Sequence, residues 1–164
     1  MQIPLVIFQF FALLPMWKLA DQLRQLPLRQ VASLIVSSKS KNEPLGMVGA
    51  AKPSMHFYTK QIVVYEGRST GALVNLADRL RFEERRGWKG RPIFGSKGSK
   101  TALLVIDKST TERPHWKGLS YKPLGEFGIY KVWRLDRRSL EKRANQLINK
   151  GFQPTWRIPR PERF

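Results

Sequence analysis

The sequence predicts an α/β domain: a small, mostly parallel sheet of about four strands, flanked by helices and followed by an irregular, basic C-terminal tail. Three observations lead to this prediction. Short, almost continuous apolar runs are typical of strands buried on both faces of a sheet. Segments with apolar residues at helical spacing alternate with these runs, which favours parallel strands joined by helices. The chain has 164 residues, 41% of them hydrophobic, which is enough for one domain with its own core.

Four segments have the pattern of strands. Three are apolar runs bounded by turn residues, at 45–49, 61–65 and 102–107. The fourth, 128–135, alternates apolar and polar residues more regularly, as an edge or antiparallel strand does. The core is expected to include Val31, Leu34, Met47, Val48, Ile62, Val64, Leu76, Leu80, Leu103, Val105, Ile129 and Leu147.

Helical spacing places helices around these strands. Apolar residues recur every three or four positions over 16–26, and Pro27 suits the first position of a second helix. A third helix follows Gly67. The last helix is predicted to be capped by Ser139 and to end at Gly151, because serine favours helix starts and glycine favours helix ends.

The chain divides into an apolar N-terminal segment (1–17), the α/β domain (18–151) and a tail (152–164). Residues 3–17 carry no charge but are shorter than the roughly 20 apolar residues of a transmembrane helix. They fit a buried N-terminal element, the remnant of a membrane helix or a signal sequence. The tail holds three prolines and no periodicity, which predicts an extended segment.

The charge balance points to an anionic partner. Thirty Lys and Arg against twelve Asp and Glu leave a net charge of +18. Such a field attracts nucleic acid, acidic lipid or phosphorylated substrates. Aromatic side chains interleave with the cations, which suits both base stacking and lipid headgroups, although a merely solvated basic surface also fits. The predicted basic surface comprises Arg85, Arg86, Lys89, Arg91, Arg137 and Arg138.

Few residues suggest catalysis. The absence of cysteine excludes disulfides, thiolate metal sites and Cys nucleophiles, and the presence of only two histidines argues against a multi-histidine metal centre. No metal or cofactor is therefore expected. No GxSxG, GxGxxG or phosphate-loop motif is present. Asp107 at a strand end and His115 eight residues later form the one weak candidate pair, and the simpler interpretation is two solvated loop residues.

A small anion-binding site is predicted after the first strand. The backbone over 50–55 would offer unpaired N–H groups at the start of a short helix, beside Lys52 and Ser54. His56 and Tyr58 are expected to lie near this site and to add polar contacts. The alternative is a tight strand-to-helix turn with no ligand.

The segment EPLGMVGAAKPSMHFYTKQIVVYEG (43–67) resembles a region of known glycosyltransferases. It is similar to the soluble domain after the last membrane helix in bacterial, especially cyanobacterial, enzymes of the dolichyl-phosphate-mannose mannosyltransferase and aminoarabinose transferase type. The similarity lies in a strand like EPLGMVG, then KPS, an aromatic pair before Thr, and a strand like QIVVY. Weaker similarity at 13–35 and 123–135 extends it, in patches, over about 13–135.

The resemblance implies a non-catalytic accessory or remnant domain of a membrane glycosyltransferase. The family's catalytic acidic residues lie in loops among early transmembrane helices, so no catalytic residue can be carried over to this chain, and whether it belongs to an active enzyme stays open. The implied partners are an anionic membrane surface or a polyprenyl-phosphate lipid, and also a separate membrane subunit. The implied location is the extracytoplasmic face of a membrane. The alternative function is a basic nucleic-acid-binding protein, with a cytoplasmic location if the resemblance fails.

Overall fold

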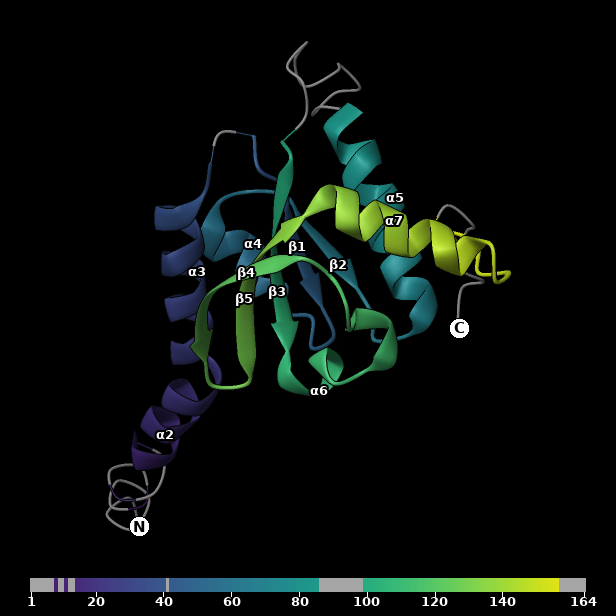
Figure 1. The fold of residues 1–164 in the computed structure, drawn as a ribbon. Coiled ribbons are helices and arrows are strands. Elements are labelled where there is room, and N and C mark those ends of the chain that lie inside the picture. Colours follow the sequence, from purple (N-terminus) through teal and green to yellow (C-terminus); the bar gives the residue numbers. More distant parts are fainter. Residues whose placement is uncertain (1–7, 9–10, 12–13, 41, 86–98, 157–164) are drawn as a thin grey trace.

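Five strands form one sheet with helices on both faces (Figure 1). The computed structural model describes residues 8, 11, 14–40, 42–85 and 99–156. The strand order is β2-β1-β3-β5-β4. The strands are β1 (Leu45–Val48), β2 (Val63–Glu66), β3 (Thr101–Asp107), β4 (Tyr121–Phe127) and β5 (Tyr130–Asp136).

The predicted α/β class with flanking helices is confirmed, but the sheet is mixed and has one strand more than the predicted number of about four. The prediction of a mostly parallel sheet is wrong. β1 runs parallel to β2 and β3, whereas β5 runs antiparallel to β3 and β4. The antiparallel ladders are the longer ones, so most paired residues are antiparallel. A tight turn at Gly128, whose φ is 58°, joins β4 directly to β5. A connection this short can only join antiparallel strands.

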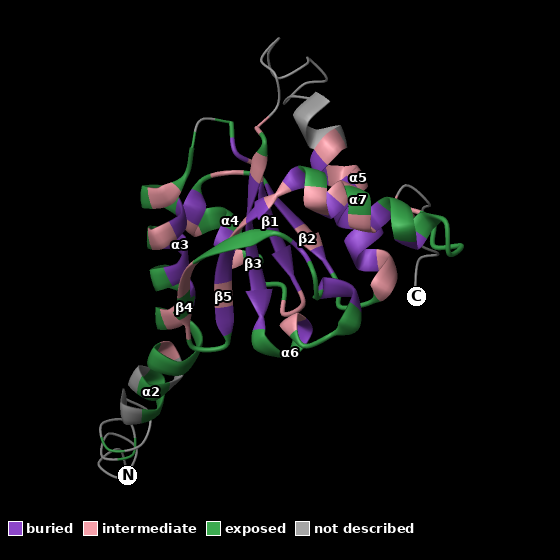
Figure 2. Ribbon diagram, viewed as in Figure 1, coloured by how far each residue is buried: buried purple, intermediate pink, exposed green. Residues whose placement is uncertain are grey.

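One face of the sheet is covered by α3 (Leu26–Ser38) and the short helix α4 (Ser54–Thr59). Pro27 lies in the first turn of α3, as predicted. Figure 2 shows the buried side of α3 turned toward the sheet. The buried apolar residues on this face include Leu28, Val31, Ile35, Met47, Met55, Val105 and Val132.

The opposite face is covered by α5 (Thr70–Arg85) and α7 (Arg137–Ile148). The short helix α6 (Lys108–Thr111) and the 3-10 helix η3 (Pro114–Trp116) lie between β3 and β4 in the chain. The buried apolar residues on this face include Leu73, Leu76, Leu80, Leu104, Trp116, Trp133 and Leu140. The third and fourth predicted helices therefore correspond to α5 and α7.

The cap of α7 differs from the prediction. The N-cap residue is Asp136, and its carboxylate accepts a hydrogen bond from the backbone N–H of Ser139 at 2.9 Å. Asp136 ends β5, so strand and helix adjoin without a loop. α7 ends before Gly151, whose φ of 94° lies in the region that glycine adopts readily.

Two predicted core residues lie at the surface. Ile62 precedes β2 and is 45% exposed, and Ile129 in the β4–β5 turn is 54% exposed. Both were placed in strands from their apolar runs, but they fall just outside the paired residues. Leu34 is half-buried and packs close to Gly125, where an added Cβ would lie 2.8 Å from the Leu34 side chain.

Helix α2 (Leu14–Arg24) extends away from the sheet (Figure 1). It has the expected apolar periodicity, but those of its large apolar side chains that the structure describes are exposed. Trp17 is 79% exposed and Leu23 is 70% exposed. Among the described residues, no helix combines the length and apolar character that crossing a membrane would take.

The start of the tail packs on α5. The backbone N–H of Thr155 donates to Asn75 Oδ1 at 2.8 Å, and Trp156 Nε1 donates to Asp78 Oδ2 at 2.8 Å. The guanidinium of Arg79 lies 5.7 Å from the centre of the Trp156 ring. These contacts connect residues about 80 positions apart and hold the chain after α7 against α5.

Candidate functional site

The connections of the parallel strands define a switch point between β1 and β3. The chain leaves β1 through α4 on one face to reach β2, and returns through α5 on the other face to reach β3. In open α/β sheets, ligands bind outside the carboxyl ends of the strands at such a point. Here those ends are Gly49, which follows β1, and Asp107, which ends β3.

The side-chain carboxylate of Asp107 occupies the position at this switch point where a ligand would bind. It is 3% exposed and accepts hydrogen bonds from the backbone N–H groups of Thr110 at 2.8 Å and Ala50 at 3.1 Å. Arg68, which follows β2, donates to it at 2.6 Å. Burial acts to raise the pKa of Asp107, but the hydrogen bonds from Thr110 and Arg68 outweigh it and hold the pKa below the ordinary value. The carboxylate is thus ionised at neutral pH.

Gly49 allows the β1 loop to approach this carboxylate. Its φ is 90°, and an added Cβ would lie 2.7 Å from the Asp107 carboxylate and 2.6 Å from Thr110 Oγ1. A side chain at this position would therefore displace the carboxylate from its donors. The arrangement ties the ends of β1, β2 and β3 together. The role it supports for Asp107 is that of a structural anion.

His115 is not among the hydrogen-bonding partners of Asp107, so the structure pairs Asp107 with Arg68 instead. His115 lies in η3, is 8% exposed, and its Nε2 has no hydrogen-bonding partner among the described residues. Burial, followed by the nearby charges of Arg113 and Arg143, lowers the pKa of His115. The imidazole is therefore neutral at pH 7.

The buried, neutral His115 predicts a pH-dependent stability. Unfolding restores its ordinary pKa near 6.5. The unfolded state then binds more protons below that pH, so stability is fully present above it and falls as the pH drops below it. Thermal unfolding between about pH 7.5 and 5.5 should show this fall in the unmodified protein, and His115→Gln should flatten it.

The matched control is the other histidine of the chain. His56 is exposed, so His56→Gln should keep the slope of the unmodified protein. Equal slopes for the unmodified protein and His115→Gln would contradict the assignment.

The residues of the predicted anion site lie on and just before α4. Lys52 and His56 are exposed, whereas Ser54 and Tyr58 are half-buried. The Tyr58 hydroxyl donates to Gln25 Oε1 at 3.2 Å, so this side chain reaches toward the junction of α2 and α3. The site stays a prediction.

The backbone of the turn before α4 is already hydrogen-bonded in part. The predicted unpaired N–H groups include those of Ala50, Ala51 and Met55, which donate to Asp107 Oδ2, the Gly49 carbonyl and the Lys52 carbonyl. The Tyr65 hydroxyl donates to the carbonyl of Lys52 at 3.2 Å and lies 3.4 Å from that of Pro53. These contacts hold the turn against β2, whether or not an anion binds beside it.

The predicted basic surface separates into parts. Arg86, Lys89 and Arg91 lie outside the described residues, as does the side chain of Arg85. Successive helix residues point about 100° apart, so neighbours at the start of α7 face different ways. Arg137 is 8% exposed, and its Nη1 donates to the carbonyl of Ser99 at 3.0 Å. Arg138 is exposed.

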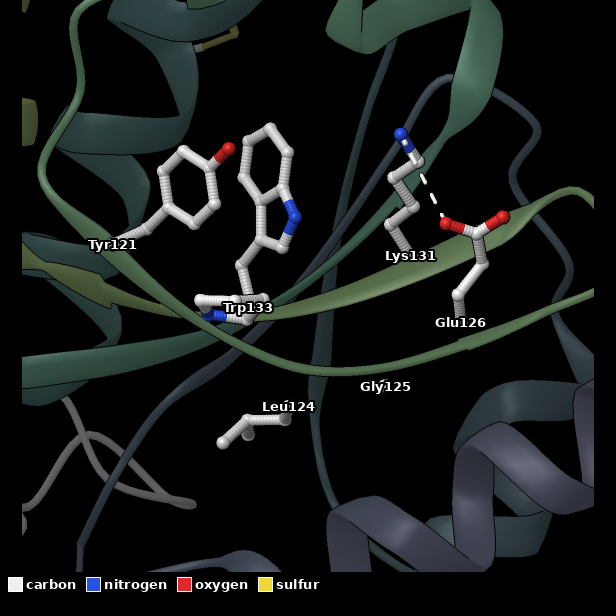
Figure 3. Close-up of a pocket in the computed structure, with 7 residues that line it drawn as sticks. Tyr121, Leu124, Gly125, Glu126, Lys131 and Trp133 are labelled. Carbon is white, nitrogen blue, oxygen red and sulfur yellow. Dashed lines mark ion pairs between the residues drawn. The ribbon is translucent and has the colours of Figure 1, made fainter.

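A shallow apolar groove lies on β4 and β5 (Figure 3). The rings of Tyr121 and Trp133 stack with centroids 3.9 Å apart. Glu126 pairs with Lys108 at 2.7 Å and lies 3.9 Å from Lys131. The charged groups at this groove are thus paired with one another. The groove is not predicted from the sequence, because the expected strands do not include 121–127, although a glycine between two alternating segments is a hairpin signal.

Among the described residues, no group of three His, Asp or Glu side chains could hold a metal ion.

The fold defines a class of α/β domain with a mixed sheet and an internal carboxylate at its switch point. The family model for the cyanobacterial RgtA-type glycosyltransferase C-terminal domain matches residues 38–151, and the chain belongs to this family. This confirms the resemblance found in the sequence.

A solved structure is also similar, the crystal structure of ArnT from Cupriavidus metallidurans bound to undecaprenyl phosphate. It is 16% identical, with a TM-score of 0.41, and the match covers 66% of this chain and 19% of that one. The chain therefore spans about a fifth of the solved chain it matches. No curated protein matches.

Proposed function

We propose that this chain is a membrane-surface domain of a glycosyltransferase, with no catalytic residue of its own, which docks on an anionic bilayer through α2. The observation that carries the proposal is the uncovered apolar side of this helix. We further propose that the lipid bound is a polyprenyl phosphate or another acidic lipid. The proposed location is the extracytoplasmic face of the membrane.

The side chains of α2 suit a lipid interface. Met16, Trp17 and Leu23 are 68%, 79% and 70% exposed, which is unusual for large apolar residues in a folded domain. Tryptophan favours the headgroup level of a bilayer. Arg24 in the last turn of α2 adds a cation beside them, and the net charge of +18 favours anionic lipid.

The β4–β5 turn extends this apolar surface. Gly128 lies so close to Pro27 that an added Cβ would be 3.2 Å from the proline ring, which brings the turn to the α2–α3 junction. Ile129 in this turn is 54% exposed, and Leu26 at the junction is 42% exposed. The backbone N–H of Lys108 donates to the Ile129 carbonyl at 2.9 Å and fixes the turn to the end of β3.

Vesicle flotation of the full chain tests the proposal. At low salt the protein should float with phosphatidylcholine vesicles that contain phosphatidylglycerol, and float less with phosphatidylcholine alone. The Trp17→Glu/Leu23→Glu variant should lose at least about tenfold in partitioning, because each buried apolar side chain contributes about 1.5–3 kcal/mol.

The matched control is Ile148→Glu/Phe152→Glu, which places two glutamates on exposed apolar residues at the end of α7. It should float like the unmodified protein. Equal loss in both variants, or no flotation of the unmodified protein, would contradict the proposal. RNA binding with a steep salt dependence and no preference for vesicles would favour the nucleic-acid alternative instead.

A further inference from the structure

A second surface, on α7, gathers cations around a groove. Its lining includes four basic side chains and one carboxylate. We call it the α7 groove, and it is formed by Lys117, Gly118, Asp136, Arg138, Ser139, Lys142, Arg143 and Gln146. A neighbouring hollow shares Arg143 and Gln146 and continues to Lys150, so the cationic surface is elongated along the helix.

The groove follows one side of α7. Arg138, Lys142 and Gln146 are spaced four residues apart, which places them in a row along the helix. At a rise of about 1.5 Å per residue, this row spans about 12 Å. Such a row can contact several anionic groups of one elongated ligand.

The cations of the groove lack acidic partners among the described residues. None of the ion pairs found in this part of the chain includes Lys117, Arg138 or Lys142. The acidic residue within α7, Glu141, lies 3.3 Å from Arg81 of α5 and not in the groove. The carboxylate of Asp136 caps the helix.

Two further side chains are held in position for a ligand. The guanidinium of Arg143 donates to Gln146 Oε1 at 3.1 Å and to the carbonyl of Pro114 at 3.2 Å. These neutral acceptors orient Arg143 without neutralising its charge. Ser139 Oγ accepts a hydrogen bond from the backbone N–H of Ser120 at 2.9 Å, which leaves its hydroxyl hydrogen free to donate.

The arrangement works against the stability of the helix. Arg138 lies in the first turn of α7, where the helix dipole disfavours a cation. Arg138 and Lys142 are like charges at i,i+4 spacing, which is also unfavourable. Residues that lower local stability with no compensating stabilising contact are typical of functional surfaces.

We propose that the α7 groove binds a soluble, elongated ligand that carries two or more phosphate groups. Among the described residues, no aromatic side chain lines the groove, so this part of the chain offers nothing for nucleic-acid bases to stack on. α7 and α2 lie at opposite ends of the domain, so a bilayer in contact with α2 does not reach the groove (Figure 1). This binding is separate from the proposed membrane contact.

Calorimetric titration of the full chain with tripolyphosphate, pyrophosphate and inorganic phosphate tests the proposal. Tripolyphosphate should bind at least about tenfold more tightly than inorganic phosphate, because it contacts more than one cation of the row. Lys142→Glu should weaken tripolyphosphate binding at least about tenfold. Lys122→Glu makes the same charge change at an exposed lysine of β4 outside the groove, and should change the affinity less than about twofold.

Arg138→Glu separates binding from folding. It should also weaken tripolyphosphate binding, yet leave the melting temperature unchanged or raise it by about 1–4 °C, because an acidic residue suits the first turn of a helix. Flotation with anionic vesicles should be unaffected by Lys142→Glu. The titration and the flotation assay therefore test phosphate binding and membrane docking separately. Equal losses in Lys142→Glu and Lys122→Glu, or equal affinity for tripolyphosphate and inorganic phosphate, would overturn the inference. Tighter binding of single-stranded DNA than of tripolyphosphate would overturn it as well.

Discussion

Glu43→Gln is expected to lower the free energy of unfolding by about 3–5 kcal/mol, a large share of the stability of a domain this size. Glu43 is 1% exposed. Its Oε1 accepts from Arg134 Nε at 3.0 Å and from Thr101 Oγ1 at 2.6 Å, and its Oε2 accepts from the backbone N–H of Ser40 at 3.1 Å. Glutamine keeps the shape of the side chain but removes the charge and replaces one acceptor by a donor. Arg134 is then left partly buried without its counter-charge.

Urea denaturation measures this loss. Glu112→Gln is the matched control, because Glu112 is exposed and has no ion pair among the described residues, and it should change stability by less than about 0.5 kcal/mol. Adding Arg134→Met to Glu43→Gln should recover part of the loss, because removing both partners leaves no unpaired charge. A loss below about 1 kcal/mol in the single variant would show that the ion pair contributes little to stability.

No local pattern in the sequence indicates the role of Glu43. It lies within a polar stretch (37–44) that predicts a loop, just before β1. Its partner Arg134 is 91 residues away on β5. The two meet because β1 and β5 both pair with β3, an order that periodicity alone does not determine. Long-range ion pairs of this kind need the strand order before they can be predicted.

The elements that the sequence predicted well are those whose signal is local. α3, α5 and α7 have apolar residues at helical spacing, and β1 and β3 are continuous apolar runs. β4 was missed because Pro123 and Gly125 interrupt its pattern and cause a register shift against β5. An edge strand tolerates both residues, since one of its sides has no strand partner.

The candidate site was predicted only in part for the same reason. Asp107 was recognised as a polar residue at the end of a buried strand, which is where α/β domains place functional groups. Its partners come from the ends of other strands, Arg68 after β2 and Ala50 after β1. His115 is close in the sequence, but it is buried in η3 and is not among the hydrogen-bonding partners of the carboxylate.

Asp107→Asn tests whether this carboxylate holds the strand ends together, and it should cost about 2–4 kcal/mol of stability. Asparagine keeps the size of the side chain but has one acceptor oxygen. The backbone N–H groups of Ala50 and Thr110, which bond to different oxygens of Asp107, then compete for it. One buried donor is left without an acceptor, and that is the main source of the loss. Urea denaturation at neutral pH measures it.

Arg68→Met separates the backbone hydrogen bonds from the ion pair. The Arg68 side chain is 47% exposed, so water screens its charge and its removal should cost less than about 1 kcal/mol.

The pH dependence of stability gives an independent check. Because the pKa of Asp107 is lowered from 3.8, its contribution is present above that pH and is lost as the pH falls through the lowered value. Asp107→Asn should lack this acid-dependent loss, whereas Arg68→Met should keep most of it, since Thr110 still holds the carboxylate ionised. Equal losses of stability in the two variants would show that the ion pair, and not the backbone donors, holds the ends of β1 and β3 together.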